Sequence, residues 1–364
     1  MLTSFYNGFG EDFIKVFLFS TFHLFLIEKI IPQAYIAQPY EEDFRLIFTN
    51  KIIAKSNYNV INFMDARSDT ANLGFVFSGP QNKRVAVIPR IEFPIQFNGL
   101  LKTSTDSSSA EGELLFQLRK FKFAERLESD LFNICLLRAD LFVKNNNVYT
   151  KLDRIDTIIT LEATEAAAGL FKETSYAITS FVLTNLKRKI LTNESYTYYQ
   201  LLHIDSIEKS KLKLYRLKEN EFINGAYETF ESFKNQTPDS KITDVIYRQG
   251  KVVRLKTLDK KGKKHIVKPK QIYAFVFVGN PFISAKYDCY KLNKVNSDFV
   301  FAGEDKTEVK GANEVIAGTV GFAFAGKMGK AAARKIASNS AIAFFEIKID
   351  HIDGSFIRIK QTKN

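Results

Sequence analysis

The densest group of charged side chains in the chain is a run of cations between Lys251 and Lys270, which is opposed only by Asp259. Residues 259–265 have the composition of a hairpin tip. Clustered positive charge of this kind attracts phosphate or sulfate groups. The candidate anion-binding residues are Lys260, Lys261, Lys263, Lys264 and His265. A lysine-rich turn is more often a solvated tip that keeps strand edges from pairing, and this interpretation stays open.

A second candidate is the segment from Gly311 to Ala343, which is rich in glycine and alanine. It contains an uncharged apolar run, Val315 to Ala325, followed by several cations. The segment from Gly311 to Ala343 also contains two pairs of small residues that would allow helices to approach closely: Gly318 with Gly321, and Gly326 with Gly329. The apolar run is too short to span a bilayer, which takes about 20 residues. Residues 315–335 are therefore interpreted either as a membrane-docking or self-association segment, or as a packed helix or loop.

Local motifs for catalysis or metal binding are absent from the sequence. Its histidines beyond the N-terminal segment, His203, His265 and His351, lie far apart, and none has a Cys or His at ligand spacing. Asp153 and Asp156 lie three apart in a predicted strand, so they should face opposite ways. We therefore expect a non-enzymatic protein that acts by binding or assembly, without a metal or cofactor. An enzyme whose site forms only on folding is the alternative.

The N-terminal segment predicts export. Val16 to Ile27 is uncharged and apolar, and residues 33–38 end in Ala37-Gln38, which resembles a signal-peptide cleavage site. Glu11 and Asp12 occupy positions where cations are usual, so an uncleaved anchor or a buried helix are alternatives. We expect a signal peptide over residues 1–37 and a location in the periplasm or cell envelope. Lipid anchoring at the cleavage site is excluded because the first cysteine is Cys135.

The overall charge limits the classes of binding partner, and the cysteine content limits disulfide bonding. The net charge of +12 favours an anionic envelope surface or another envelope protein, or it only keeps the chain soluble. Export makes nucleic acid an unlikely partner. Cys135 and Cys289 are too few for a disulfide framework, and they are either free or paired with each other.

The remaining pattern predicts an α+β fold with an N-terminal mixed sheet and a packed helix, then a β-meander or small open barrel, and a C-terminal β-hairpin. In the first domain, residues 38–200, the strand at 113–123 has apolar side chains at alternate positions. Midway along it the apolar residues change to the other set of alternate positions, as a β-bulge would cause. The other elements expected in this domain are strands at 85–89, 131–143 and 148–162, an Asn145–Asn147 turn, and a helix from Ile178 with Lys187-Arg188-Lys189 in its last turn.

The second region, residues 201–303, is expected to be rich in short strands, and residues 304–364 combine the Gly/Ala segment with a terminal hairpin. A strand is predicted at 212–215, and Gln249-Gly250 predicts a hairpin between residues 242–247 and 252–258. Alternation over residues 344–359 around Asp353-Gly354 predicts the terminal hairpin. Further short strands are expected at 272–278, 282–287, 290–295 and 299–302.

Residues 225–238 have the pattern G-x-Y-x-x-F-x-x-F-x-x-x-x-P. With the strand at Tyr273–Phe277 and the closing Lys348–Gly354, this pattern resembles a group of uncharacterised exported proteins of Bacteroidota, over the chain from Ile207 onward. The resemblance implies export but no particular chemistry. Tyr227, Phe230 and Phe233 are three apart, which predicts one buried face of a helix that ends at Pro238.

Overall fold

The computed structural model describes residues 41–48, 52, 53, 55–78, 83–127, 131–162, 167–218, 221–306 and 342–362. The expected signal segment 1–37 and the segment 315–335, with Gly318, Gly321, Gly326 and Gly329, lie outside these residues. Within the described part of the chain, no helix is long and apolar enough to cross a membrane. The described residues belong to one compact unit.

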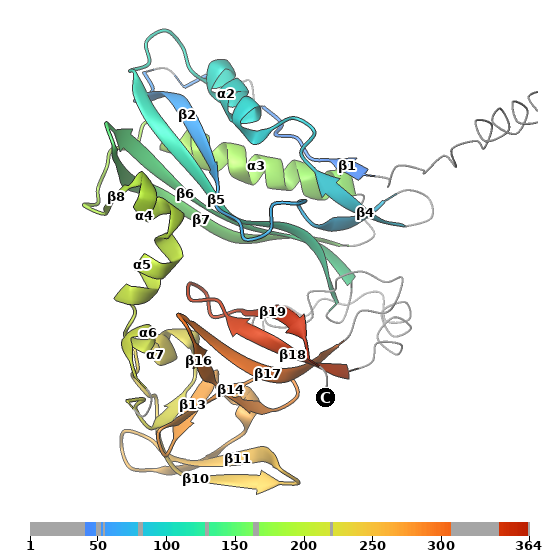
Figure 1. Cartoon of the computed structure of the whole chain (residues 1–364), viewed down its shortest axis with the longest axis vertical. Helices are drawn as coiled ribbons and strands as arrows, with labels where there is room; N and C mark the ends of the chain where they lie inside the picture. The colour runs from blue at the N-terminus through green and yellow to red at the C-terminus, as the bar shows by residue number, and fades with distance from the viewer. Residues whose placement is uncertain are drawn as a thin grey trace, which may run out of the picture. The chain divides into compact units, whose positions relative to one another are not determined.

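A five-stranded sheet dominates the N-terminal half (Figure 1). Its order is β2 (Tyr58–Asp65), β5 (Gly112–Leu127), β6 (Leu131–Asn145), β7 (Val148–Glu162) and β8 (Ser195–Thr197). The β2–β5 pair is parallel and the other pairs are antiparallel, so the predicted mixed sheet is confirmed. A smaller sheet contains β1 (Glu41–Asp43), β4 (Lys83–Ile88) and β3 (Phe75–Ser78).

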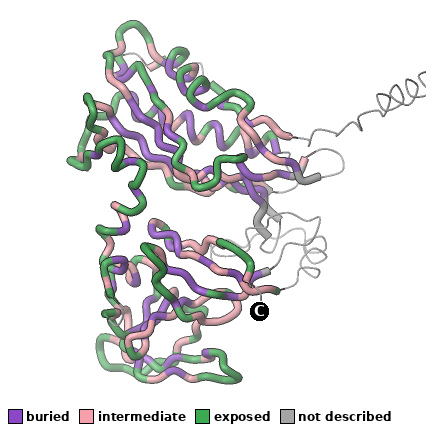
Figure 2. Tube along the Cα trace, viewed as in Figure 1, coloured by how far each residue is buried: buried purple, intermediate pink, exposed green. Residues whose placement is uncertain are grey.

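Helices α2 (Phe93–Ser104) and α3 (Ala167–Asn185) cover one face of the five-stranded sheet (Figure 1), and buried residues recur along the strands beneath them (Figure 2). The sequence analysis missed α2, which begins with a proline in its first turn and buries Phe93, Phe97 and Leu100 at helical spacing. Helix α3 was predicted, but it ends at Asn185. The placement of Lys187-Arg188-Lys189 in its last turn was therefore wrong.

Strand β5 contains the bulge that the phase shift predicted. Its pairing with β6 shifts between Leu118 and Lys120, which leaves Arg119 as the extra residue. Leu118 before the bulge and Phe121 after it are both buried beneath the helices. As a result, Arg119 and Lys120 both point to the opposite face of the sheet, where their partners lie. The predicted turn between β6 and β7 is also confirmed, with Asn146 at a φ of 54°.

Three short helices lead out of the first sheet: α4 (Tyr198–Leu202), α5 (Ile204–Lys211) and α6 (Lys213–Arg216). The predicted strand at 212–215 was wrong, because Leu212 caps α6 and the following residues form that helix. Leu214 and Tyr215 are adjacent and both buried, which a strand with one exposed face would not allow.

The rest of the chain is built from short antiparallel strands, which confirms the predicted meander and terminal hairpin. One sheet contains β15 (Cys289–Lys291), β14 (Asn280–Ser284), β13 (Ala274–Phe277) and β9 (Gly225–Tyr227). The second contains β10 (Lys241–Arg248), β11 (Lys251–Leu258) and β12 (Lys264–Val267). The third contains β16 (Asn293–Val295), β17 (Asp298–Lys306), β18 (Ile342–Ile349) and β19 (Phe356–Gln361).

The aromatic module of residues 225–238 is core, as expected, because Tyr227 and Phe233 are fully buried. Its secondary structure differs from the prediction: Tyr227 lies in β9, and only Phe230–Lys234 forms a helix, α7. Gly225 has a φ of 154°, and a Cβ atom there would lie 2.4 Å from Cβ of Pro238. The glycine and the proline of the pattern are therefore packing partners, and the proline does not end a helix that begins at Tyr227.

Candidate functional site

The face of the five-stranded sheet opposite α2 and α3 carries charged residues at alternate positions. Arg138 and Asp140 on β6 pair with Asp156 and Arg154 on β7, respectively. Residues two apart in a strand share a face, and the intervening Ala139 lies in the apolar core under the helices. This sheet therefore has one apolar face under the helices and an opposite face whose middle carries ordered charges.

An inner cluster of charges surrounds Asp140, whose side chain is completely buried. Arg154 donates to both of its oxygens, from Nε at 2.6 Å and from Nη2 at 2.8 Å. Arg119 Nη1 lies 2.9 Å from Oδ2, and Lys151 Nζ lies 3.3 Å from Oδ1. Burial alone would raise the pKa of Asp140, but these three cations outweigh it and lower that pKa.

Helix α5 contributes a second carboxylate, Glu208, to the inner cluster. Its carboxylate accepts from Arg154 Nη2 at 2.5 Å and from Arg119 Nη2 at 2.7 Å, and it lies 3.3 Å from Nε2 of His351. Burial opposes ionisation here too, yet hydrogen bonds from His351 and Arg119 and the charge of the two arginines lower the pKa of Glu208 well below its usual range. The guanidinium of Arg119 also bonds Asp205, one turn earlier on α5.

An outer cluster joins the sheet to the turn between β18 and β19. Arg138 is buried and donates through Nη1 to both oxygens of Asp350, at 2.9 and 3.1 Å, and through Nη2 to Asp353 at 2.8 Å. Its Nε lies 2.9 Å from Asp156, and Lys120 Nζ lies 3.5 Å from Asp350. Burial would raise the pKa of Asp350, but Arg138 and Lys120 lower it to about 2.

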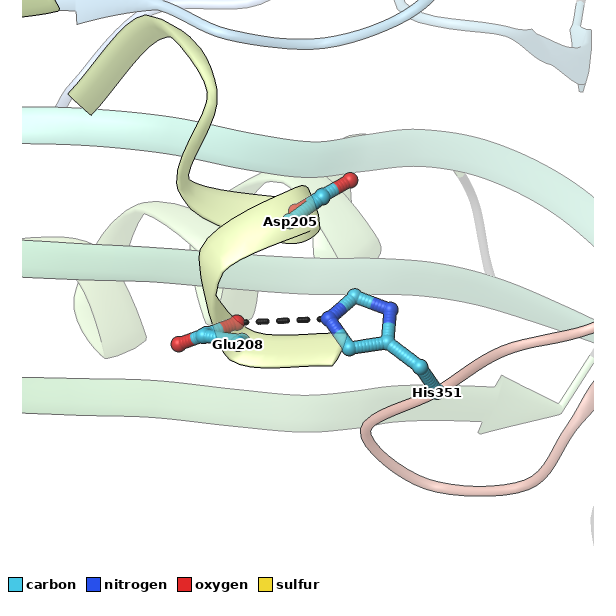
Figure 3. A group of neighbouring side chains, drawn as sticks. All are labelled: Asp205, Glu208 and His351. Atoms are coloured by element: carbon cyan, nitrogen blue, oxygen red, sulfur yellow. Dashed lines mark hydrogen bonds and ion pairs between the residues drawn. The ribbon is translucent and has the colours of Figure 1, made fainter. Parts of the chain in front are cut away.

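Residues from two distant parts of the chain form a group with the chemistry of metal ligands. Oxygens of Asp205 and Glu208 and a ring nitrogen of His351 lie within 4.8 Å of one another (Figure 3). The group fits a divalent cation poorly, because Arg119 already bonds both carboxylates and Arg154 bonds one of them. Two adjacent guanidinium groups would repel a metal ion. No local spacing in the sequence indicated that His351 approaches these carboxylates.

A cavity of about 800 Å³ lies beside the outer cluster, between the charged face of the sheet and the β18–β19 hairpin. Ile134, Leu136 and Ile158 line it from the sheet, and Ile357 and Ile359 line it from β19. Leu136 pairs with Ile158 across β6 and β7, and Arg138 pairs with Asp156 two residues further on. The wall therefore changes from apolar to charged along the strands.

The charged end of the cavity presents both signs of charge to solvent. The side chains of Asp156 and Asp353 are 31% and 38% exposed, and those of Lys120 and Lys348 are 24% and 33% exposed. All four line the cavity. A ligand group with a single charge would therefore meet like charges as well as opposite ones.

The candidate anion-binding residues lie elsewhere. Lys260, Lys261 and Lys263 lie in the tip between β11 and β12, which confirms the predicted hairpin, and Lys264 and His265 begin β12. None of these five residues lines the cavity. His265 Nε2 lies 3.0 Å from Asp259.

Two further expectations about reactive side chains can be compared with the structure. Asp153 bonds Asn185 at the end of α3 and Asp156 contacts Arg138, so they face opposite ways as predicted. Cys135 and Cys289 are free thiols, and burial raises the pKa of each. Neither thiol is therefore suited to act as a nucleophile at neutral pH.

The charged clusters are poorly suited to general acid–base catalysis. A general base works best with a pKa near the working pH, whereas Asp140, Glu208 and Asp350 all have lowered pKa values. Each is a weak base that remains ionised and bonded to arginine. The arrangement is instead suited to holding α5 and the β18–β19 turn against the sheet.

Comparison with known proteins adds no functional assignment. No protein-family model matches this chain, and neither a curated protein nor a solved structure matches it.

Proposed function

We propose that this chain is an exported envelope protein that binds an amphipathic molecule in the cavity between the five-stranded sheet and the β18–β19 hairpin. The observation that carries the proposal is the division of one cavity wall into an apolar end at Leu136 and Ile158 and a charged end at Arg138 and Asp156. Its volume of about 800 Å³ lies in the range of small-molecule sites, about 300–1,000 Å³.

The apolar end and the charged end of the cavity together indicate the chemistry of the ligand. An acyl chain would lie between Leu136 and Ile158 on one side and Ile357 on the other, where it would bury apolar surface at about 25 cal/mol per Å². At the charged end, partly exposed carboxylates and ammonium groups line the same cavity, which suits a zwitterionic head group with one group of each sign. The charged clusters support this function by fixing the hairpin wall of the cavity.

The absence of tryptophan from the chain gives a direct test. In the variant Leu136→Trp, the single indole would form part of the cavity wall. Ile95→Trp is the matched control, because Ile95 is 62% exposed on α2, which covers the other face of the sheet. The probe is a lysophosphatidylcholine with a doxyl group on its acyl chain, used below its micelle concentration.

Bound probe should quench the fluorescence of Leu136→Trp in a saturable way and leave Ile95→Trp unchanged. Doxyl stearate, which has an anionic head group, should quench more weakly at equal concentration. Equal quenching of the two variants, or none in a Leu136→Trp chain that keeps the wild-type circular dichroism spectrum, would overturn the proposal.

Export is the second part of the proposal and has its own test. It is supported by the apolar Val16–Ile27 run and the small residue before Gln38 in the sequence. N-terminal sequencing of the protein from its native host should find a chain that begins at Gln38. An intact chain in the cytosolic fraction would contradict export and leave the cavity proposal standing.

A further inference from the structure

The positive charge of the chain is concentrated in one small sheet. Residues 241–270, which contain β10, β11 and β12 and are here named the basic sheet, hold eleven Lys and Arg against two Asp. This gives a net charge of +9 in thirty residues, out of +12 for the whole chain. All eleven cationic residues are exposed.

Most of these cations have no acidic partner in the part of the chain that the structure describes. Lys256 pairs with Asp244, and Lys251 lies 3.6 Å from Glu304. Among the residues that the structure describes, the other nine form no ion pair: Lys241, Arg248, Arg254, Lys260, Lys261, Lys263, Lys264, Lys268 and Lys270. Their mutual repulsion weakens the fold, so a site that gathers them is suited to an external anionic surface.

The outward face of the basic sheet also exposes apolar side chains. Its inward face packs Val252 and Leu255 into a small core, while Lys256 and Ile266 pair on the outward face. Ile266 is 62% exposed between cations, and Tyr247 at the end of β10 is 53% exposed. A surface that combines cations with exposed apolar groups is typical of a membrane interface.

A strained turn carries another exposed apolar residue beside the basic sheet. The turn between β13 and β14 places Val278 at a φ of 49°, and Val278 is 72% exposed. A surface hollow of about 620 Å³ is bordered by Val278 together with Lys241 and Lys260. The side chains of Val278 and the basic sheet therefore share one surface.

In the other two-residue hairpin turns named here, the first residue of the turn, which corresponds to Val278, is polar. Asn146, Gln249 and Asn296 have φ values of 54°, 51° and 55° in the turns that precede β7, β11 and β17. Asparagine tolerates this left-handed conformation, whereas a β-branched side chain is strained in it. An exposed valine that gives neither good turn geometry nor burial points to a contact outside the chain.

We propose that the basic sheet docks the protein onto an anionic lipid bilayer, with Lys and Arg at the phosphate level and Ile266 and Val278 in the head-group region. Each cation near an anionic membrane contributes about 1 kcal/mol, and the attraction is screened by salt. This surface is distinct from the cavity, so it would bring the protein to a membrane without occupying the ligand site.

Vesicle flotation of the full-length protein tests the electrostatic part. The chain should float with vesicles of phosphatidylcholine and 30% phosphatidylglycerol, and not with pure phosphatidylcholine. The variant Lys260→Gln/Lys261→Gln/Lys263→Gln/Lys264→Gln should bind roughly 1,000-fold more weakly at low salt, and the difference should shrink as salt screens the attraction. The matched control neutralises four exposed lysines elsewhere and should keep most of the affinity: Lys102→Gln, Lys172→Gln, Lys187→Gln and Lys189→Gln.

The apolar part separates a membrane from a nucleic acid. Ile266→Ser/Val278→Asn should reduce vesicle binding roughly tenfold at high salt, where charge attraction is screened, and should fold normally because both residues are exposed. Equal loss in the two lysine variants would overturn the proposal. So would binding to a DNA duplex by a chain that does not float with anionic vesicles.

Discussion

The two most highly charged regions of the molecule use the same side chains in opposite ways. Around Arg138 and Asp140, on the charged face of the five-stranded sheet, buried cations and carboxylates are matched one against another. In the basic sheet, nine exposed cations have no acidic partner in the described structure. Charge that is matched and buried fixes one arrangement of the chain, whereas charge that is unmatched and exposed is available to a partner.

The two regions should respond differently when a single charged side chain is removed. Removal of a buried partner leaves the remaining charge desolvated and unpaired, which is costly. Removal of an exposed cation leaves only a solvated surface and relieves repulsion. Three predictions test this contrast.

The largest effect is expected at Arg138. Arg138→Ala leaves Asp350, which is 5% exposed, without its main cation, and should lower the free energy of unfolding by about 3–5 kcal/mol. Arg254→Ala in the basic sheet is the control and should change it by less than about 0.5 kcal/mol. Urea denaturation followed by circular dichroism measures both variants, and similar losses would remove the contrast between the two regions.

An intermediate effect is expected from the pH dependence of Asp350. Its pKa is lowered to about 2 in the folded chain from 3.8, so its contribution is present above about pH 4 and is lost as the pH falls toward 2. Over that window the wild type should lose about 2 kcal/mol more stability than Asp350→Asn. Asp69→Asn is the control, because Asp69 forms no ion pair within the described chain. Identical pH profiles for the wild type and Asp350→Asn would contradict the assignment.

The smallest effect is expected when the tip of the basic sheet is neutralised. Substitution of Lys260, Lys261, Lys263 and Lys264 by Gln should leave the free energy of unfolding within about 0.5 kcal/mol of the wild type, or raise it slightly. Any gain should shrink in high salt, because salt already screens the repulsion between these lysines. Thermal unfolding at two salt concentrations measures this, and a clear loss of stability would show that the lysines serve the fold.

Local patterns in the sequence predicted the parts of the fold that depend on side-chain alternation and on the backbone conformation of single residues. The bulge at Arg119 follows from a shift in apolar phase, and the turns at Asn146 and Gly250 follow from residues that tolerate positive φ. Short elements were harder: Leu212–Tyr215 gives too few positions to separate a strand from the single turn of α6. Helix α2 was not predicted, although Phe93, Phe97 and Leu100 recur at helical spacing after its N-terminal proline.

The charged clusters could not be predicted in the same way. Arg138, Glu208 and Asp350 are spread over more than 200 residues, and only the tertiary fold brings them together. One signal was available: Arg138 and Asp140 alternate with apolar residues inside a predicted strand, which places charges on one face of a sheet. That pattern indicates a paired face but does not identify the partners.

The bulge at Arg119 also sets how β5 would respond to a change in chain length. Leu118 pairs with Ala139 and Lys120 pairs with Arg138, so β6 continues without interruption past the extra residue. Deletion of Arg119 would therefore leave a regular strand in which Phe121 and Phe123 still face the helices. Insertion of one more residue beside Arg119 would instead turn the following segment over and bring these two rings to the charged face. The loss on deletion would be the guanidinium that bonds Asp140 and Glu208, and the faces of the strand would be kept.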